Sequence, residues 1–411
     1  MKKFIAFILT VSLVLCAFPV CSFALTDGDF EYFIENGRAV VTGYIGYNPT
    51  CEVPATLGGK KVKRLGVGVG YIDTWGSDVI VDLIVPECVE EVCNFSINEN
   101  NTLKTITIKN GGCSVSGFGY CKGLESLVIE NGGKGYGEVN GSFSYCENLK
   151  TVKLSERTKV IGDGAFAQCP SITEITLPKK LQRLGNNAFT NCGALEKVTI
   201  PDTPEKMGGN CFSDCDSLET VNILEGVTEL GVGCFYGCDG LVTVKTPFGF
   251  RRFGPETNYG NDTFKNCSAL TYMIISYGPE YIPDMVFDGC IALSEVTIPY
   301  SVKTIHRDAF KDSDLTLIKG IKGTAAEQYA NFMGIPFEEI EHIYGDLDWN
   351  ERVEAKDALL ALCNTVGTVD FIDYHKVSAD VNADGKVTAA DALMILQHSV
   401  GLRTVFPAEI G

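Results

Sequence analysis

Two loops near the C-terminus carry oxygen-bearing side chains at a spacing that could hold a metal ion. The second loop starts at Asp380 and places such side chains at positions 1, 3, 5, 9 and 12, with Gly385 at position 6. Ca²⁺ takes six to eight oxygen ligands, and a glycine lets the chain turn sharply enough for flanking carboxylates to converge. The first loop starts 34 residues earlier, at Asp346. The spacing predicts calcium binding; the alternative is a pair of solvated acidic turns, which the duplication disfavours.

Short apolar patterns of helical period follow both loops, at residues 357–362 and 391–396. No comparable pattern leads into either loop, so each unit is expected to be a loop followed by one helix. Residues 341–411 are therefore expected to form a small all-α calcium-binding domain.

The N-terminus has the pattern of a secretory signal. Lys2 and Lys3 precede an apolar run, and Ser22 and Ala24 stand at the −3 and −1 positions of a cleavage site. A retained membrane anchor is disfavoured because Pro19 and this site close the run at about 18 residues, the lower limit for a span. We expect residues 1–24 to be removed and the mature chain to be secreted.

The chain is acidic, with a formal net charge of −18 at pH 7. Nucleic acids and anionic membranes select basic surfaces, so neither is an expected partner. The acidity fits solubility and cation binding.

A ladder of phenylalanines runs through the middle of the chain, with a spacing of 23 residues in seven of nine intervals. Its members are Phe95, Phe118, Phe143, Phe166, Phe189, Phe212, Phe235, Phe264, Phe287 and Phe310. Repeats of 20 to 29 residues with an apolar strand pattern are typical of leucine-rich solenoids, whose rungs must stack to bury their apolar side. We expect a mainly β solenoid of parallel strands, about 11 rungs long, over residues 71–340.

A cysteine follows three residues after each of eight ladder phenylalanines. These are Cys121, Cys146, Cys169, Cys192, Cys215, Cys238, Cys267 and Cys290. Equivalent residues on adjacent rungs lie about 4.8 Å apart, whereas the Cβ atoms of a disulfide lie about 3.8 Å apart. We therefore expect buried, unpaired thiols that pack as small apolar groups.

The repeat Phe-x-x-Cys-x-x-Leu-x-x-Ile-x-Ile-Pro resembles the BspA-like subclass of bacterial leucine-rich repeats. Residues 32–66 are similar to the N-terminal cap of that family, here assigned to 25–70, and residues 320–335 to its closing helix. The resemblance implies a surface or secreted protein that functions in adhesion or protein recognition. The fold itself implies no chemistry.

The two C-terminal loops and their helices resemble a type I dockerin. The resemblance implies two bound calcium ions and a cohesin partner on the scaffolding protein of a cellulosome. The implied ligands of the first site are Asp346, Asp348, Asn350, the carbonyl of Arg352, Glu354 and Asp357; those of the second are Asp380, Asn382, Asp384, the carbonyl of Lys386, Thr388 and Asp391. Partner choice in dockerins depends on loop positions 10 and 11, which are Ala355 and Lys356 in the first loop and Ala389 and Ala390 in the second.

The first loop departs from the pattern because Glu351 stands at position 6 in place of glycine. A side chain held in a left-handed conformation costs on the order of 1–2 kcal/mol. We therefore expect the second site to bind calcium more strongly than the first.

Catalytic patterns are missing from the sequence. The four histidines have no metal-binding spacing, and residues 66–70 lack the full dinucleotide-binding fingerprint. Paired acids for glycoside hydrolysis can come from anywhere in a chain, so a glycoside hydrolase is the lower alternative.

Departures from the 23-residue period are candidate partner-binding loops. One insertion carries Phe250, Arg251 and Arg252, a second departure contains Trp75, and a third covers residues 131–136. The alternative is that the insertion folds back over an edge of the solenoid. We expect a non-catalytic binding subunit whose repeats recognise a protein; a carbohydrate-binding or adhesion module in polysaccharide degradation is the second class.

Overall fold

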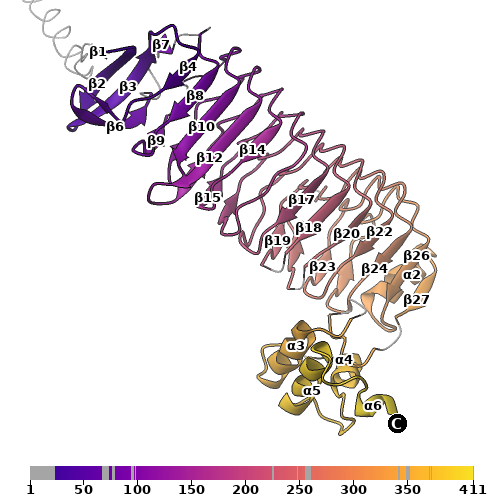
Figure 1. Cartoon of the computed structure of the whole chain (residues 1–411). Coiled ribbons are helices and arrows are strands. Elements are labelled where there is room, and N and C mark those ends of the chain that lie inside the picture. Colours follow the sequence, from indigo (N-terminus) through magenta and orange to yellow (C-terminus); the bar gives the residue numbers. More distant parts are fainter. Residues whose placement is uncertain are drawn as a thin grey trace, which may run out of the picture.

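The computed structural model describes residues 24–66, 74–75, 79–93, 97, 99–224, 226–247, 249–254, 261–340, 343–348, 352–369, 371 and 373–410. The expected signal before residue 24 lies outside these ranges, as do Phe95, Asn350 and Glu351. A long stack of rungs is followed by a small helical unit (Figure 1). Within the described ranges, no helix has both the length and the apolar character needed to cross a bilayer.

Each rung places its strands in parallel beside the same strands of the next rung. Lys197 pairs with Thr220, and Thr220 pairs with Thr243. Because side chains alternate along a strand, a register that repeats with the sequence period keeps every inward residue in one continuous column. The predicted parallel β solenoid is confirmed.

One side of the stack consists of two parallel sheets, whose outward side we call the front face. Their orders are β14-β12-β10-β8-β4 and β17-β18-β20-β22-β24-β26-β27. The bounds are β4 (Thr50–Glu52), β8 (Asp82–Val85), β10 (Thr105–Asn110), β12 (Ser126–Gly132), β14 (Thr151–Lys153), β17 (Lys197–Ile200), β18 (Thr220–Ile223), β20 (Thr243–Lys245), β22 (Tyr272–Ile274), β24 (Glu295–Thr297), β26 (Leu317–Gly320) and β27 (Phe337–Glu339).

A second row of mostly short strands closes the rungs. Its main sheet has the order β1-β2-β3-β6-β9-β11-β13-β15-β16, with β5 on β6 and β7 on β3, and the pairs β19–β21 and β23–β25 lie further along the chain. The bounds are β1 (Leu25–Asp27), β2 (Phe30–Glu35), β3 (Arg38–Tyr44), β5 (Thr56–Leu57), β6 (Lys60–Leu65), β7 (Thr74–Trp75), β9 (Glu91–Val92), β11 (Ser114–Val115), β13 (Gly137–Val139), β15 (Thr158–Ile161), β16 (Arg183–Leu184), β19 (Glu229–Leu230), β21 (Arg252–Phe253), β23 (Tyr281–Ile282) and β25 (Thr304–Ile305). The antiparallel strands β1 to β3 cap the N-terminal edge.

The ladder phenylalanines form one continuous stack inside the solenoid. From Phe118 to Phe310, successive rings lie 5.0–5.8 Å apart between centroids and within 10° of parallel. The members from Phe118 to Phe287 have no solvent exposure. Each ring therefore packs on the rung before it and the rung after it, as the repeat predicted.

The ladder thiols are free and buried. Seven of them donate Sγ–H to the backbone carbonyl of the phenylalanine in the preceding rung, at Sγ to oxygen distances of 3.0–3.3 Å. The series runs from Cys146, which donates to Phe118, to Cys290, which donates to Phe264. Burial raises the pKa of Cys169 to about 12. Such thiols form little thiolate at neutral pH, so they pack and donate rather than react.

A glycine column explains how closely the rungs approach. A Cβ atom on Gly208 would lie 2.3 Å from the backbone carbon of Gly185, and one on Gly231 would lie 2.4 Å from that of Gly208. Real Cβ contacts are not this short, so the close approach of adjacent backbones requires glycine here.

Helix α2 (Ala325–Met333) closes the C-terminal end of the solenoid. Tyr329 packs its ring 5.8 Å from Phe310, the last ring of the stack, and donates its hydroxyl to the carbonyl of Arg307 at 3.1 Å. Gly334 ends the helix with φ of 71°. The apolar column is therefore covered by a helix rather than left open.

The described residues of the C-terminal unit form the helices α3 (Ala355–Thr365), α4 (Asp373–Ala379), α5 (Ala389–Ser399) and α6 (Pro407–Ile410). It contacts the end of the solenoid through α4, where the ring of His375 lies 3.9 Å from that of Tyr300. The His375 imidazole also hydrogen-bonds the carbonyl of Leu347 at 3.3 Å. One side chain thus contacts both the solenoid and the first acidic loop.

Candidate metal centres and partner surface

The first acidic loop is organised by the start of α3. Asp357 accepts hydrogen bonds from the backbone N–H groups of Leu347 at 2.7 Å and Asp348 at 3.0 Å through one oxygen, and from Glu354 at 2.7 Å through the other. The last of these is half of a capping box that fixes the first turn of α3. The position-12 carboxylate therefore holds both ends of the loop.

Three carboxylates of this loop converge in the interior. Oxygens of Asp346, Asp348 and Asp357 all lie within 4.8 Å of one another, and the three residues are 5%, 3% and 0% exposed. Burial, together with the charge of Asp348, raises the pKa of Asp357 to about 7, against the lowering effect of its N–H donors. Buried like charges need a cation, and an all-oxygen donor set suits Ca²⁺. The residues fit the ion that the spacing predicted.

The other expected ligands of the first site are Glu354, the carbonyl of Arg352 and Asn350. Glu354 lies at the N-cap of α3, half-buried, with its carboxylate 4.0 Å from the Arg352 guanidinium. The expected ligand at Arg352 is its carbonyl, and the residue is exposed. Asn350 lies outside the described residues.

The second loop is held by turns of its own backbone. Asp380 accepts from the N–H groups of Asp384 at 3.0 Å and Gly385 at 2.7 Å. Asn382 accepts from the same Asp384 N–H at 2.8 Å, and Asp384 accepts from Lys386 at 2.9 Å. Gly385 has φ of 83°, the left-handed conformation that its position was expected to require.

The end of the second loop repeats the capping geometry of the first. Asp391, fully buried, accepts from the N–H of Thr388 at 2.9 Å and from its hydroxyl at 3.0 Å. Asp384 and Lys386 remain exposed. The donor types again fit Ca²⁺, in a more open loop than the first.

A small apolar core supports both loops. Helices α3 and α5 share it through Ala361 and Ile395, and Phe406 is fully buried in it. Tyr344 packs against the same core, and a Cβ atom on Gly345 would lie 2.8 Å from the Phe406 ring. The two ends of the unit therefore meet at this core.

The expected partner positions lie at the first turns of α3 and α5. Ala355, Ala389 and Ala390 are exposed, and Lys356 is half-exposed. Beyond them, both helices carry apolar residues toward solvent at positions 34 residues apart. The exposed fractions are 58% and 55% for Leu359 and Leu393, 42% and 40% for Leu362 and Leu396, and 71% and 62% for Val366 and Val400.

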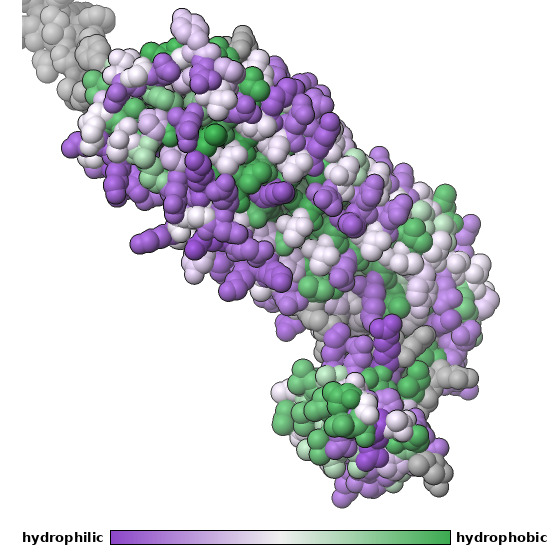
Figure 2. All heavy atoms as spheres, viewed as in Figure 1, coloured by the Kyte–Doolittle hydropathy of each residue, from purple (hydrophilic) through white to green (hydrophobic). Residues whose placement is uncertain are grey.

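Figure 2 shows hydrophobic side chains gathered on the surface of this helical unit. Sequence reasoning did not single out these positions as a surface. The sequence nevertheless contains a signal for this surface. The same apolar positions recur in both copies, and they lie away from the side of each helix that packs into the core.

The insertion at residues 247–259 was expected to expose aromatic and arginine side chains. The structure contradicts this for Phe250, which is 0% exposed, packs its ring 4.8 Å from that of Phe253 and joins the solenoid core. The loop covers the core because two aromatic rings gain more from burial than from solvent contact. For Phe250, the alternative interpretation is therefore the correct one: the insertion folds back over the solenoid.

The neighbouring positions differ from Phe250. Arg252 donates through two nitrogens to one Glu229 oxygen, at 2.9 and 2.7 Å, so its charge is already partnered. Arg251 is exposed and stays a candidate. The side chain of Trp75 lies outside the described residues, although its backbone forms β7 on β3.

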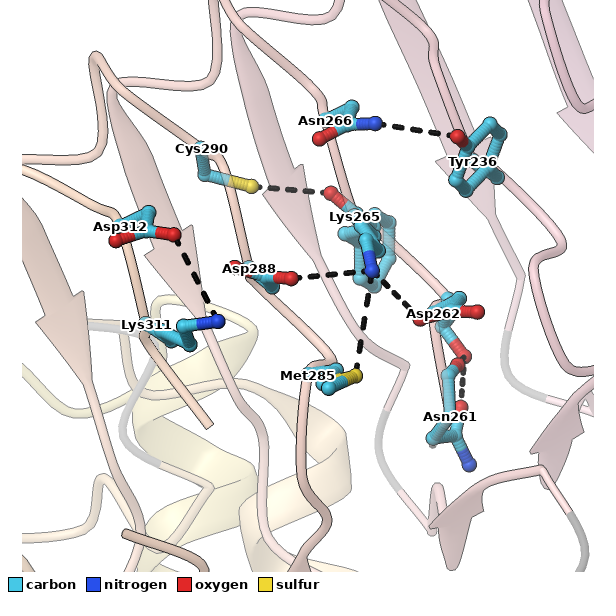
Figure 3. A network of polar contacts seen from close by, with 12 residues as sticks. Tyr236, Asn261, Asp262, Lys265, Asn266, Met285, Asp288, Cys290, Lys311 and Asp312 are labelled. Carbon is cyan, nitrogen blue, oxygen red and sulfur yellow. Dashed lines mark hydrogen bonds and ion pairs between the residues drawn. The ribbon is translucent and has the colours of Figure 1, made fainter. Parts of the chain in front are cut away.

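A polar network on neighbouring rungs bears on the hydrolase alternative (Figure 3). The Lys265 ammonium lies 3.1 Å from Asp288 and 3.6 Å from Asp262. The hydrogen bond to Asp288 raises the pKa of Lys265, which keeps the lysine charged. Both carboxylates are therefore engaged by one ammonium group in an ion-pair network between rungs.

Comparison with protein families gives two matches. The model of the BspA type leucine rich repeat region matches residues 76–154, 139–261 and 257–330, and that of the dockerin type I domain matches residues 344–398. A search of curated proteins gives no match.

Solved structures similar to this chain are bacterial leucine-rich repeat proteins. A protein from Bacteroides ovatus is 22% identical, with a TM-score of 0.46 over 77% of this chain and 100% of its own. A leucine rich cell surface protein from Faecalibacterium prausnitzii is 22% identical, with a TM-score of 0.35 over 75% of this chain and 97% of its own. The pneumococcal vaccine antigen PcpA is 16% identical, with a TM-score of 0.36 over 77% and 98%.

Both kinds of module are non-catalytic, and type I dockerins bind calcium and take a cohesin partner. The matched repeats cover most of the chain, and the acidic loops lie within the dockerin match. The chain belongs to the BspA-type leucine-rich repeat family and ends in a type I dockerin domain.

Proposed function

We propose that this chain is a secreted, non-catalytic binding subunit of a cellulosome. Its dockerin attaches it to a cohesin on a scaffolding protein, and its repeat domain recognises a protein target. The observation that carries the docking half is the duplicated apolar surface of α3 and α5, led by Leu359 and Leu393. Exposed apolar patches of this kind in a soluble unit are typical of protein interfaces.

The duplication supports docking in two orientations. The equivalent pairs Leu359 and Leu393, and Leu362 and Leu396, have nearly equal exposure on two helices that start with the same capping box. A cohesin surface that accepts one helix would then accept the other after the unit turns over. Either helix alone would suffice for capture.

We expect loss of one helix face to be tolerated and loss of both to be severe. The paired variants are Leu359→Ala with Leu362→Ala on α3, and Leu393→Ala with Leu396→Ala on α5. Each pair alone should weaken cohesin binding only a few-fold. All four should weaken it about 30-fold or more, because each orientation then lacks two contact residues and truncation of a hot-spot residue costs over 1 kcal/mol. The measurement is surface plasmon resonance against a cohesin panel in calcium, after circular dichroism has confirmed the helices. Loss of capture with either pair alone would contradict two-orientation docking.

A protein target for the repeats is supported by the composition of the front face. Among the described residues of its strands, the outward positions are mixed and mostly polar, for example Lys197, Thr199 and Asn222, without a row of coplanar aromatics. Sugar binding was the second class, and the burial of Phe250 and Phe253 takes these two rings out of the aromatic row that would have favoured it. A screen of the full chain against polysaccharide arrays and surface-protein extracts tests the choice, and binding to insoluble glucans alone would reverse it.

We further propose that the dockerin holds two calcium ions, the second more tightly than the first. Gly385 adopts the left-handed conformation at position 6 without cost, while Glu351 occupies that position in the first loop. Strain of about 1–2 kcal/mol corresponds to roughly a tenfold loss of affinity.

The substitution Glu351→Gly should therefore tighten the weaker calcium site by about tenfold and leave the stronger one unchanged. Isothermal titration of the chelator-stripped protein with Ca²⁺ would resolve the two steps. The matched control is Lys386→Gly, one position after the second-loop glycine, which relieves no strain. Unchanged or weaker binding after Glu351→Gly would contradict the proposal.

A further inference from the structure

The first acidic loop contacts helix α4 at two points. The His375 imidazole donates to the carbonyl of Leu347 at 3.3 Å, and the N–H of Gly345 donates to the carbonyl of Ser378 at 2.8 Å. Because a carbonyl oxygen only accepts, the Nε2 atom of His375 carries the hydrogen in the first of these bonds. Helix α4 therefore holds the start of the loop on both sides of Asp346.

The carbonyl that His375 holds belongs to the peptide group between Leu347 and Asp348. The N–H of the same peptide group donates to Asp357 at 3.0 Å. This peptide group is therefore fixed through its oxygen by α4 and through its nitrogen by the position-12 carboxylate. Its orientation directs the carboxylates of Asp346 and Asp348, which are two of the three that converge. Groups that orient metal ligands in this way affect metal affinity without touching the ion.

The equivalent peptide group of the second loop is held in a different way. Its carbonyl is that of Val381, 34 residues after Leu347, and it accepts from the backbone N–H of Ala408 in α6 at 3.1 Å. Its N–H, from Asn382, donates to Asp391 at 3.3 Å. The second loop thus receives from the backbone of the dockerin the hydrogen bond that the first loop receives from a side chain.

The side chain of His375 is enclosed by rings from both parts of the chain. It is 1% exposed, and its ring centroid lies 3.9 Å from that of Tyr300 in the solenoid and 5.2 Å from that of Phe371 in the dockerin. Tyr300 is itself 5% exposed and packs at 5.1 Å against Tyr277, one 23-residue period earlier. Because close packing fixes the rotamer of a buried ring, the solenoid helps to determine where the His375 N–H points.

We propose that the solenoid supports the first calcium site of the dockerin, with His375 and Tyr300 as positioning residues. This inference rests on the proposed function, in which the dockerin holds two calcium ions. Tyr300 holds the imidazole, the imidazole holds the Leu347 carbonyl, and this peptide group directs two buried aspartates toward the ion. The second site does not depend on the solenoid, because the backbone of Ala408 holds the equivalent peptide group.

Coupling of this kind acts in both directions. If the contact between His375 and Tyr300 tightens calcium binding in the first loop, then calcium in that loop strengthens the contact by the same factor. The first ion is therefore expected to close the junction between the solenoid and the dockerin, and the second ion is not.

The test is an isothermal titration of the chelator-stripped full chain with Ca²⁺. Nuclear magnetic resonance assigns the steps, because the amide signal of Asp348 follows the first loop and that of Asn382 follows the second. Tyr300→Ala removes the ring that holds His375 and should weaken the first-loop step about tenfold, while the second-loop step stays unchanged. The matched control is Tyr281→Ala on the solenoid strand β23, where the side chain is 43% exposed, and both steps should remain as in the wild type.

Two substitutions of His375 separate its hydrogen bond from its packing. His375→Phe keeps a ring against Tyr300 but has no N–H to donate, so it should weaken the first-loop step about tenfold. His375→Gln keeps a donor at a similar distance from the backbone and should stay within about threefold of the wild type. A role in packing alone predicts the opposite order, because glutamine fills less of the space between the rings.

The reverse direction of the coupling has a spectroscopic readout. The ring of Tyr300 shifts the ring-proton signals of His375, and these shifted signals should appear together with the Asp348 amide signal of the calcium-bound first loop. They should be lost in Tyr300→Ala and kept in Tyr281→Ala. Shifted His375 signals that appear already at the second-loop step would mean that the junction closes without the first ion, and they would overturn the proposal.

The calcium titrations can overturn the proposal in three further ways. These are an unchanged first-loop step in Tyr300→Ala, an equal weakening of both steps, and tighter first-loop binding by His375→Phe than by His375→Gln. The second-loop step also reports whether each variant folds. A wild-type titration without a first-loop step would contradict the proposed pair of calcium sites, and this inference with it.

Discussion

Removal of calcium is expected to unfold the dockerin and abolish cohesin capture while the solenoid stays folded. Three carboxylates of the first loop lie buried within 4.8 Å of one another, and their mutual repulsion is unopposed without a cation. The core that must resist this is small, with residues such as Ala361, Ile395 and Phe406 at its centre. In small metal-binding units the binding free energy is folding free energy, so chelation unfolds them.

The measurement combines capture of the full chain on immobilised cohesin with nuclear magnetic resonance of the dockerin region before and after EDTA. Capture should fall below detection and the amide signals of α3 and α5 should collapse. EDTA saturated beforehand with Ca²⁺ is the matched control and should change nothing. Capture that survives EDTA would contradict the calcium dependence of docking.

The solenoid is expected to withstand EDTA because the two cores are separate. The phenylalanine stack belongs to one cluster of buried residues, and the dockerin core forms another. The contact between the two parts described above is that of His375 with Tyr300. Loss of that contact changes how the dockerin sits and leaves the phenylalanine stack intact.

The sequence predicted the solenoid well because its information is repeated. One rung alone is ambiguous, but a phenylalanine that recurs with period 23 can only be the inward residue of a stacked rung. Phe250 lies outside the period, and nothing local distinguishes an exposed aromatic loop from one folded over the core. Its burial is set by distant rungs, through contact with Phe253 and Phe287 beyond it.

The metal loops were also predictable as to residue type, but their relative burial was not. The acidic positions and Gly385 follow from the spacing that oxygen ligands need. No local pattern indicates that Asp346 and Asp348 are buried while Asp384 is exposed. That difference comes from packing of the first loop under α4, where His375 reaches the carbonyl of Leu347.

The break in the front face between β14 and β17 is a third case of this kind. Residues 172–178 have the same apolar spacing as the rungs on either side, so the sequence predicts a continuous sheet there. Strand pairing in a solenoid depends on how each rung fits on the next, and a small offset of one strand is enough to remove its hydrogen-bond ladder. The rings of Phe166 and Phe189 stay stacked at this place.

Removal of one ring from the middle of the stack is expected to be the most damaging single substitution in the solenoid. Phe212 is fully buried, with neighbouring rings at 5.3 Å on one side and 5.8 Å on the other. Phe212→Ala should lower the free energy of unfolding by about 3–5 kcal/mol, because rungs above and below hold the void open. The matched control is Phe332→Ala on α2, where the ring is 75% exposed and the change should stay within about 0.5 kcal/mol.

The physical reason for the large effect also determines how it must be measured. A solenoid contacts only its nearest rungs, so a weakened middle rung can separate the unfolding of the two halves. Urea unfolding followed by circular dichroism should show a lower midpoint for Phe212→Ala and a broader or divided transition, whereas Phe332→Ala should retain the wild-type curve. A midpoint for Phe212→Ala equal to that of the control would mean that the stacked rings do not carry the stability of the rungs.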